Sequence, residues 1–289
     1  MRRIYLLYPC LLGLLTIVTT SCSSFDKEEA VPAYLRIDSI TFQRSSPLQG
    51  TESQNITEAW VFIDDQLQGI YDLPCEVPVL ALGAHNLKIR GGILRNLNSD
   101  QRVDYPLWAT YSQDVELSSN QTLVVNPVVG YFEDVTTSEE NFEDAGVQMV
   151  KSPNSDTTIF TTTRTDEVFE GNGSGKMVLT PNQFRAVVET NKRLTLPRGV
   201  PVFLELNFNT TADLRVGLVG RTNANGSTYN VIVGIKPTQG KWKKGYINLS
   251  EFVNLQAFGA TFDVYFDMAR EHPNGDSCVI DNIKFVYPQ

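Results

Sequence analysis

The chain of 289 residues contains few of the side chains that most enzymes and metal sites use: it has only 2 histidines and 4 cysteines. A catalytic triad or a histidine-based metal site needs an imidazole held beside a nucleophile or an ion. Only His272, in a loop with Glu271 and Asp276, is a candidate for that role, and a solvated polar turn is the better explanation of this loop. We therefore predict that the protein is not an enzyme.

Positive charge is also scarce, since 24 basic residues stand against 33 acidic ones and give a net charge of −9. This balance disfavours nucleic acid and anionic lipid headgroups as partners. The glycine-rich segment "GNGSGKM" does not provide a phosphate loop, because Glu170 and Met177 stand where that motif needs a glycine and a hydroxyl. We expect no nucleic-acid partner.

Long apolar runs are absent except at the start, where residues 4–18 follow Arg2 and Arg3 and are interrupted by Pro9 and Gly13. A transmembrane helix needs about 20 apolar residues, and this run is shorter. The pattern is typical of a signal peptide, which we assign to residues 1–21 and expect to be removed.

The leader ends in a small residue directly before a cysteine, Ser21-Cys22, with Thr19 where a leucine is usual. This junction resembles the lipobox of bacterial lipoproteins, and the resemblance implies that Cys22 is lipidated and becomes the mature N-terminus. Acyl chains would then attach the protein to a membrane. The alternative is ordinary signal-peptidase cleavage near Ser21.

Residues 22–32 contain a short charged tract with nothing to bury, including Asp26, Lys27, Glu28 and Glu29. One interpretation is a disordered tether between lipid and first domain. The other is that the tract is similar to the surface-export signal of Bacteroidota lipoproteins. Either interpretation implies a lipid-anchored protein of the outer membrane, and the second places it at the cell surface.

After residue 33 the apolar periodicity is that of strands, with no sustained helical period, which predicts an all-β protein. Residues 33–132 contain a strand, an Asp64-Asp65 turn, a return strand and the alternating segment "GAHNLKIR". Residues 57–92 are similar to prealbumin-like and PEGA-type modules, which implies a β-sandwich. Residues 133–140, "EDVTTSEE", lack apolar periodicity and are predicted to be an interdomain linker.

Residues 141–289 alternate clearly at Val202, Leu204, Leu206 and Phe208, and "LSEFVNLQ" indicates one short helical turn. In order, "NFE", "GSGKMVL", "WKKGYINLS" and "IDNIKF" resemble the galactose-binding-type jelly roll of carbohydrate-binding modules. We therefore predict two tandem β-sandwich domains, the second a jelly roll, after a lipoprotein signal peptide and short tether.

Two cysteines remain beyond the leader and Cys22, namely Cys75 and Cys278, and they lie in different predicted domains. A disulfide would have to cross the domain boundary, so we expect two buried free thiols.

The jelly-roll resemblance also implies a structural calcium ion held by an early carboxylate, Glu143, and one on the last strand, Asp281. The alternative is that Asp281 caps a turn or accepts backbone hydrogen bonds. No other cofactor is required.

Sugar binding in such modules uses exposed aromatic faces. Trp60 and Trp108 fall in strands of the first domain, and the resemblance implies a packed position for Trp242. The candidates that remain for glycan binding are Tyr229, Tyr246 and Tyr265.

Two functions stay open for this non-catalytic protein. It could be an accessory or scaffold subunit that binds a protein of the envelope, such as an assembly or transport machine, or it could capture glycans at the cell surface. Because no tryptophan platform is evident, the sequence favours the scaffold. An exposed aromatic platform on the second domain would favour glycan capture instead, and an exposed apolar patch a protein partner.

Overall fold

The structure is a computed structural model that describes residues 30–144, 146–222 and 226–289. The predicted signal peptide and the lipidation of Cys22 lie outside these residues. The regular secondary structure of the described chain is almost entirely β, as the periodicity predicts, with a short 3₁₀ helix η1 (Pro47–Gln49) and a short α-helix α2 (Ser250–Leu255). Within those ranges, no helix has the length and apolarity needed to cross a membrane.

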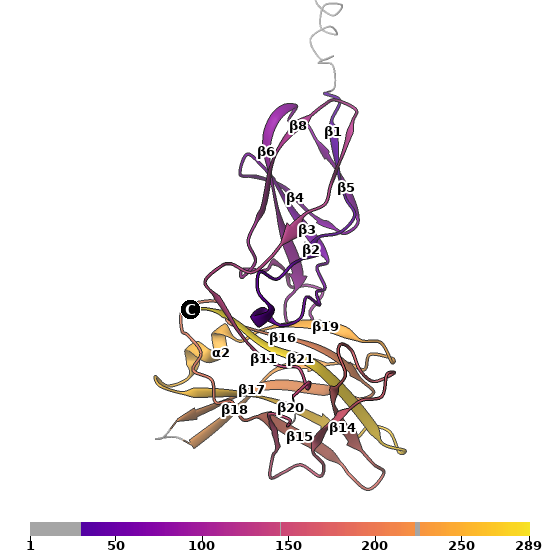
Figure 1. Ribbon diagram of the computed structural model, residues 1–289, viewed down its shortest axis with the longest axis vertical. Helices are drawn as coiled ribbons and strands as arrows, with labels where there is room; N and C mark the ends of the chain where they lie inside the picture. Colours follow the sequence, from indigo (N-terminus) through magenta and orange to yellow (C-terminus); the bar gives the residue numbers. More distant parts are fainter. Residues whose placement is uncertain (1–29, 145, 223–225) are drawn as a thin grey trace, which may run out of the picture.

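The first domain consists of ten strands in three sheets (Figure 1). The strand orders are β5-β1-β9, β10-β2 and β4-β3-β6-β7, with β8 also paired to β6. The strands are β1 (Ala33–Ile37), β2 (Thr41–Phe42), β3 (Glu58–Ile63), β4 (Gln66–Asp72), β5 (Cys75–Val79), β6 (Gly83–Leu94), β7 (Arg102–Asp104), β8 (Tyr111–Leu117), β9 (Thr122–Val125) and β10 (Val128–Val129).

The predicted Asp-Asp turn joins β3 and β4. Asp64 and Asp65 both have positive φ, 47° and 64°, which is the backbone conformation that a two-residue hairpin of this kind requires. Aspartate tolerates it better than most residues because its short side chain can hydrogen-bond locally, and Asp64 accepts a hydrogen bond from the backbone N–H of Asn86 at 2.9 Å.

The second domain consists of two stacked sheets (Figure 1). One has the order β13-β14-β21-β16-β19, with β11 paired to β21, and the other has the order β12-β15-β20-β17-β18. The strands are β11 (Val135–Glu140), β12 (Met149–Lys151), β13 (Ile159–Thr162), β14 (Ser174–Leu179), β15 (Arg185–Thr190), β16 (Phe203–Thr210), β17 (Leu214–Thr222), β18 (Gly226–Ile235), β19 (Lys243–Asn248), β20 (Thr261–Ala269) and β21 (Asp276–Pro288).

The core of this domain lies between its two sheets, where the alternating residues of β16 and β20 meet. Leu204, Leu206 and Phe208 project into it from one sheet, and Val264 and Phe266 project from the other. The alternation read from the sequence therefore identifies the inward face of β16 correctly.

The predicted linker is shorter than the sequence suggests. Residues 135–140 form β11, which pairs with β21 over the whole of its length, from Val135 opposite Pro288 to Glu140 opposite Ile283. The pairing is made by backbone hydrogen bonds, which a polar strand can form as well as an apolar one. A strand held in this way needs no apolar periodicity, which is why the sequence pattern of this segment did not indicate one.

The two domains share one continuous apolar interface. Phe203, Tyr246 and Val286, which lie on the outward face of β16, β19 and β21, belong to the same buried cluster as the core of the first domain. Tyr105 of the first domain packs against Phe203 and Tyr246, with ring centroids 4.9 and 5.4 Å apart. The strand β16 is thus buried on both faces.

A buried charge network lies within this interface, centred on Glu205 of β16. Tyr105 and Tyr131 of the first domain each donate a hydrogen bond of 2.8 Å to Glu205 Oε1. Lys244 Nζ lies 3.2 Å and Lys284 Nζ 3.9 Å from Glu205 Oε2. Burial alone would raise the pKa of Glu205, but the two ammonium groups and the two hydroxyls lower it, so the carboxylate is charged.

Cys75 and Cys278 form no disulfide bond. Cys278 is fully buried, and burial raises the pKa of its thiol to about 12. Cys75 is partly buried in the other domain.

Candidate functional site

The outward face of the sheet β12-β15-β20-β17-β18 presents a pair of tyrosines. Tyr229, on β18, is 48% exposed, and the ring of Tyr265, on β20, lies beside the Tyr229 ring with a centroid distance of 5.5 Å and an interplanar angle of 66°. This edge-on contact is a favourable arrangement for two aromatic rings. Tyr265 thereby supports Tyr229, whose ring is open to solvent.

The position of the Tyr265 ring depends on a glycine in the neighbouring strand. Gly217 of β17 lies directly opposite Tyr265, and a Cβ atom added there would be 2.3 Å from Tyr265 Cε1 and 2.4 Å from the carbonyl oxygen of Asn230. Only a residue without a side chain lets the ring lie across the strand. Burial raises the pKa of Tyr265, so its hydroxyl stays protonated at neutral pH.

On one side of the tyrosines, an arginine is fixed between two carboxylates. Arg221 donates to Glu189 Oε2 at 2.6 Å and to Asp263 Oδ2 at 3.1 Å. Both carboxylates are buried, and Asp263 also accepts a hydrogen bond from the backbone N–H of Arg193 at 3.0 Å. Charge-assisted bonds of this kind are strong and orient the guanidinium.

On the other side, Asp267 is held by two arginines. Arg185 forms a bidentate pair with it, with distances of 2.8 and 2.9 Å, and Arg215 Nη1 lies 3.5 Å from Asp267 Oδ2. The side chains of Arg185 and Arg215 are 49% and 60% exposed, so they retain N–H groups that face solvent. We call the two tyrosines and the two arginine–carboxylate groups the tyrosine platform.

The tyrosine platform combines an exposed apolar ring with fixed donors and acceptors on both sides. Asp263, Tyr265 and Asp267 project from the same face of β20 because they are two residues apart, a spacing of about 7 Å along a strand. An aromatic ring can pack on the C–H face of a sugar, and guanidinium and carboxylate groups can hydrogen-bond its hydroxyls. This surface is therefore suited to a flat ligand that is rich in hydroxyl groups.

Two of the three predicted tyrosines, Tyr229 and Tyr265, therefore lie together on the tyrosine platform. The third, Tyr246, is on the opposite sheet, where it is 1% exposed and packs against the first domain. Its hydroxyl accepts a hydrogen bond from the backbone N–H of Asn55 at 3.0 Å. Tyr246 contributes to domain packing and does not extend the tyrosine platform.

The charged members of the tyrosine platform are absent from the residues predicted from the sequence. A signal for them is present in "FDVYFDMA", where Asp263 and Asp267 flank Tyr265 at positions two residues before and after it. These three residues must share one face of a strand. Their arginine partners come from strands distant in the sequence.

The two predicted calcium ligands bind the same loop at different points. Glu143 Oε1 accepts hydrogen bonds from the backbone N–H groups of Asn172 and Gly173, at 2.7 and 3.0 Å. Asp281 Oδ2 accepts one from the Ser174 hydroxyl at 2.7 Å, and burial raises the pKa of Asp281 to about 7. Among the described residues, no three histidine, cysteine, aspartate or glutamate side chains are grouped to hold a metal ion. A calcium ion here stays a prediction.

The histidine loop is built around a carboxylate that holds a turn. Asp276 accepts hydrogen bonds from the backbone N–H groups of Glu271 and His272, at 2.7 and 3.0 Å. His272 Nδ1 lies 2.6 Å from Asp276 Oδ1, and this hydrogen bond raises the pKa of His272.

The tryptophans lie apart from the tyrosine platform. Trp108 is buried in the core of the first domain, and Trp60 lies in its strand β3. Trp242 packs against Phe169, with ring centroids 5.3 Å apart.

Comparison with known proteins gives structural matches only. No protein-family model and no curated protein matches the chain. The CBM22-1 xylan-binding domain from Paenibacillus barcinonensis matches with 12% identity and a TM-score of 0.40, over 53% of this chain and 94% of that one. The family 11 carbohydrate-binding module from Clostridium thermocellum, in complex with a β-1,3-1,4-mixed-linked tetrasaccharide, matches with 11% identity and a TM-score of 0.36, over 52% and 94%.

A third match is TmCBM61 in complex with β-1,4-galactotriose, with 12% identity, a TM-score of 0.31, and 55% and 90% coverage of the two chains. Similarity at this level assigns neither a ligand nor a function. By its own architecture the chain is an all-β protein of two packed domains. The second domain is a two-sheet sandwich whose outward sheet bears the tyrosine platform.

Proposed function

We propose that the protein is a non-catalytic, lipid-anchored protein of the outer envelope that binds a glycan across the tyrosine platform. The observation that carries this proposal is the exposed ring of Tyr229, supported edge-on by Tyr265 and flanked by arginine–carboxylate groups. The sequence alone favoured a scaffold because it revealed no aromatic platform. The tyrosine pair supplies that missing feature, so glycan capture becomes the better-supported function.

The rigidity of the platform favours binding. The glycine opposite Tyr265 and the buried carboxylates that hold Arg221 and Arg185 fix the side chains before a ligand arrives. A site that is already ordered loses little conformational entropy on binding. Pre-organisation of this kind is useful to a protein that binds a flexible polysaccharide.

The arrangement of the domains is suited to display. The described chain begins at the end of the first domain that is remote from the second, and the sheet with the platform is the layer of the second domain farther from the first (Figure 1). A lipid on Cys22 would then hold the platform away from the membrane, where a glycan could reach it.

Glycan-array binding of the full-length protein, purified in detergent, tests the proposal. We expect Tyr229→Ala to weaken binding to the glycans found by about tenfold or more, because removal of a stacked aromatic costs on the order of 1.4 kcal/mol or more. Phe258→Ala is the matched control, since Phe258 is 93% exposed but belongs to the segment between α2 and β20 and is not one of the platform residues. Equal loss in both variants, or no glycan bound by the native protein, would refute glycan capture.

The scaffold function remains a second candidate because of one apolar surface feature. Leu255 and Phe258, at and after the end of α2, are 72% and 93% exposed. Exposed apolar side chains of this size are typical of protein interfaces. Crosslinking in intact cells should capture an envelope protein through this region, and Phe258→Ala should reduce the yield; a yield that is unchanged counts against the scaffold.

A further inference from the structure

The sheet that bears the tyrosine platform ends in a long edge strand, β18. The order of this sheet is β12-β15-β20-β17-β18, so within the described chain β18 pairs with β17 on one side only. It has 10 residues, whereas β12, at the opposite edge of the same sheet, has 3. The backbone N–H and C=O groups along the outer side of an edge strand can pair with another strand.

The sequence of β18 lacks most of the features that protect an edge. Proteins commonly protect exposed edge strands with lysine, other charged residues or proline, and the segment "GSTYNVIVGI" contains none of these. The register with β17 shifts at Ile232, since Val231 lies opposite Gly217 and Val233 opposite Val216. Such a bulge interrupts pairing locally, and it leaves residues 226–231 as a regular strand with an open outer side.

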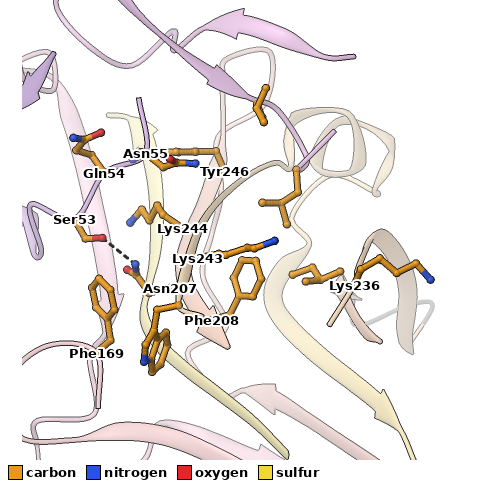
Figure 2. Close-up of a pocket in the computed structure, with 15 residues that line it drawn as sticks. Ser53, Gln54, Asn55, Phe169, Asn207, Phe208, Lys236, Lys243, Lys244 and Tyr246 are labelled. Carbon is orange, nitrogen blue, oxygen red and sulfur yellow. Dashed lines mark hydrogen bonds between the residues drawn. The ribbon is translucent and has the colours of Figure 1, made fainter. Parts of the chain in front are cut away.

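The edge strand of the other sheet, β19, is covered by the first domain instead. The backbone N–H of Asn96 donates to the Tyr246 carbonyl of β19 at 2.8 Å, and the backbone N–H of Asn55 donates to the Tyr246 hydroxyl at 3.0 Å. Figure 2 shows Asn55 beside Tyr246 at the pocket between the two domains. The first domain therefore occupies the edge of β19 at Tyr246, and β18 has no such cover in the described chain.

Two apolar side chains of β18 are exposed on the face of the tyrosine platform. Tyr229 and Val231 are 48% and 53% exposed, and they share one face because they are two residues apart. In an antiparallel pair, residues opposite each other also share a face, and aromatic and β-branched side chains form favourable cross-strand pairs. A second β18 paired antiparallel would therefore pack its own tyrosine and valine against these two side chains.

The charge distribution favours a second copy of this chain as the partner strand. The net charge of −9 makes most surfaces of the protein repel their own copies, but β18 brings no charge to a pairing with itself. The first charged residue after the strand is Lys236, whose Nζ lies 2.6 Å from Asp213 Oδ2. Antiparallel pairing puts the two Lys236 residues at opposite ends of the joined strands, so they do not meet.

The symmetry of such a pair agrees with the arrangement of the domains. Two identical antiparallel strands of one sheet are related by a two-fold axis perpendicular to that sheet, and their interface is self-complementary. Here the perpendicular to the platform sheet points toward the first domain, because the other sheet and then the first domain are stacked on it (Figure 1). Both copies would therefore have their first domains on one side and their tyrosine platforms on the other. Two copies anchored in one membrane require this arrangement, a point that rests on the proposed lipid anchor.

We propose that β18 is a dimerisation edge, at which a second copy of this chain pairs antiparallel and joins two five-stranded sheets into one. The Tyr229 rings of the two copies then lie close to the two-fold axis, so the two tyrosine platforms form one continuous surface. A single pair of strands is only marginally stable in water, but attachment of both copies to one membrane raises their effective concentration.

Crosslinking of the full-length protein in vesicles of phosphatidylethanolamine and phosphatidylglycerol tests this interface, with no glycan present. Thr228→Cys places a thiol on the exposed, regular part of β18, where a short bis-maleimide should join two copies. Val150→Cys is the matched control, because Val150 is 42% exposed on β12, the opposite edge of the same sheet. We expect a crosslinked dimer from Thr228→Cys in clear excess over Val150→Cys and over the native protein. Equal yields from the two variants, or no dimer from Thr228→Cys, would overturn the proposal.

A charge substitution then tests whether the strands themselves pair. Val231→Lys should raise the dissociation constant of the dimer about tenfold, because it replaces an apolar cross-strand contact by two ammonium groups that face each other. Val150→Lys adds the same charge at the other edge and should leave the dimer unchanged. Since Val231 is exposed, the melting temperature of Val231→Lys should match that of the native protein, which separates loss of pairing from unfolding.

Sedimentation of Cys22→Ala protein at high concentration separates the interface from the proposed anchor. The same difference between Val231→Lys and Val150→Lys should appear in this background, because the edge of β18 does not depend on the lipid. A dimer of undiminished affinity in Val231→Lys would show that β18 is not the interface.

Discussion

The charge network around Glu205 gives the sharpest prediction about stability. Replacing Glu205 by glutamine keeps the shape of the side chain and leaves an oxygen that can accept from Tyr105 and Tyr131. It removes the only negative charge within 4 Å of Lys244 and Lys284 among the ion pairs of the described chain. Two buried ammonium groups would then face each other without a carboxylate between them.

The size of the effect follows from these contacts. Loss of one partner from a buried ion pair costs about 3–5 kcal/mol, because the other charge stays buried without compensation. Lys284 keeps its two carbonyl acceptors, so most of this cost falls on Lys244. Tyr105→Phe should cost less, about 1.5–3 kcal/mol, since it removes one hydrogen bond to a charged group.

The assay is urea and thermal unfolding of the full-length protein. For a chain of this size Glu205→Gln should lower the melting temperature by roughly 10 °C. Both domains should lose stability together, because Glu205 joins them. The control is Asp213→Asn, which breaks an exposed ion pair with Lys236 and should cost about 1 kcal/mol or less. A cost for Glu205→Gln no larger than that of Asp213→Asn would refute the reasoning.

Three further predictions concern single positions. Gly217→Ala should lower stability by about 1–3 kcal/mol and weaken glycan binding, because the new methyl group meets the Tyr265 ring and the Asn230 carbonyl; unchanged unfolding and binding would contradict this. Burial raises the pKa of Asp281 to about 7, so the folded protein binds the Asp281 proton more tightly than the unfolded chain does. The protonated side chain therefore contributes its full stabilisation of the fold below about pH 4, and this contribution is lost as the pH rises to about 7. The stability of Asp281→Asn should therefore fall less steeply over this range, and added calcium should raise the melting temperature only of the native protein; identical pH profiles would exclude the effect. Cys22→Ala should release the protein from membranes and abolish labelling with a fatty-acid analogue, and a membrane-bound variant would show that the anchor lies elsewhere.

The parts of the fold that depend on local pattern could be predicted. The alternation through Leu204, Leu206 and Phe208 identifies a strand and its core face because side chains alternate strictly along a strand. The Asp64-Asp65 pair identifies a hairpin for a local conformational reason. Residues 135–140 could not be predicted in this way, since β11 is fixed by its backbone pairing with a strand almost 150 positions later in the chain.

The candidate sites were predicted less completely. Tyr229 and Tyr265 were recognised as aromatic residues in strands, but nothing local indicated that Gly217 allows one ring to support the other. Tyr246 has a similar local pattern and lies at the domain interface.

The sequence by itself therefore determined the all-β class, the inward face of the main strands and the tight turn at Asp64-Asp65, because each of these depends on neighbours along the chain. Only the tertiary structure decided which outward face is open. The first domain covers the face of β16 and β19, which buries Tyr246 and Glu205, and leaves the face of β18 and β20 to solvent, which exposes Tyr229. The alternation of a strand defines two faces, but what packs on each face depends on contacts between residues far apart in the sequence.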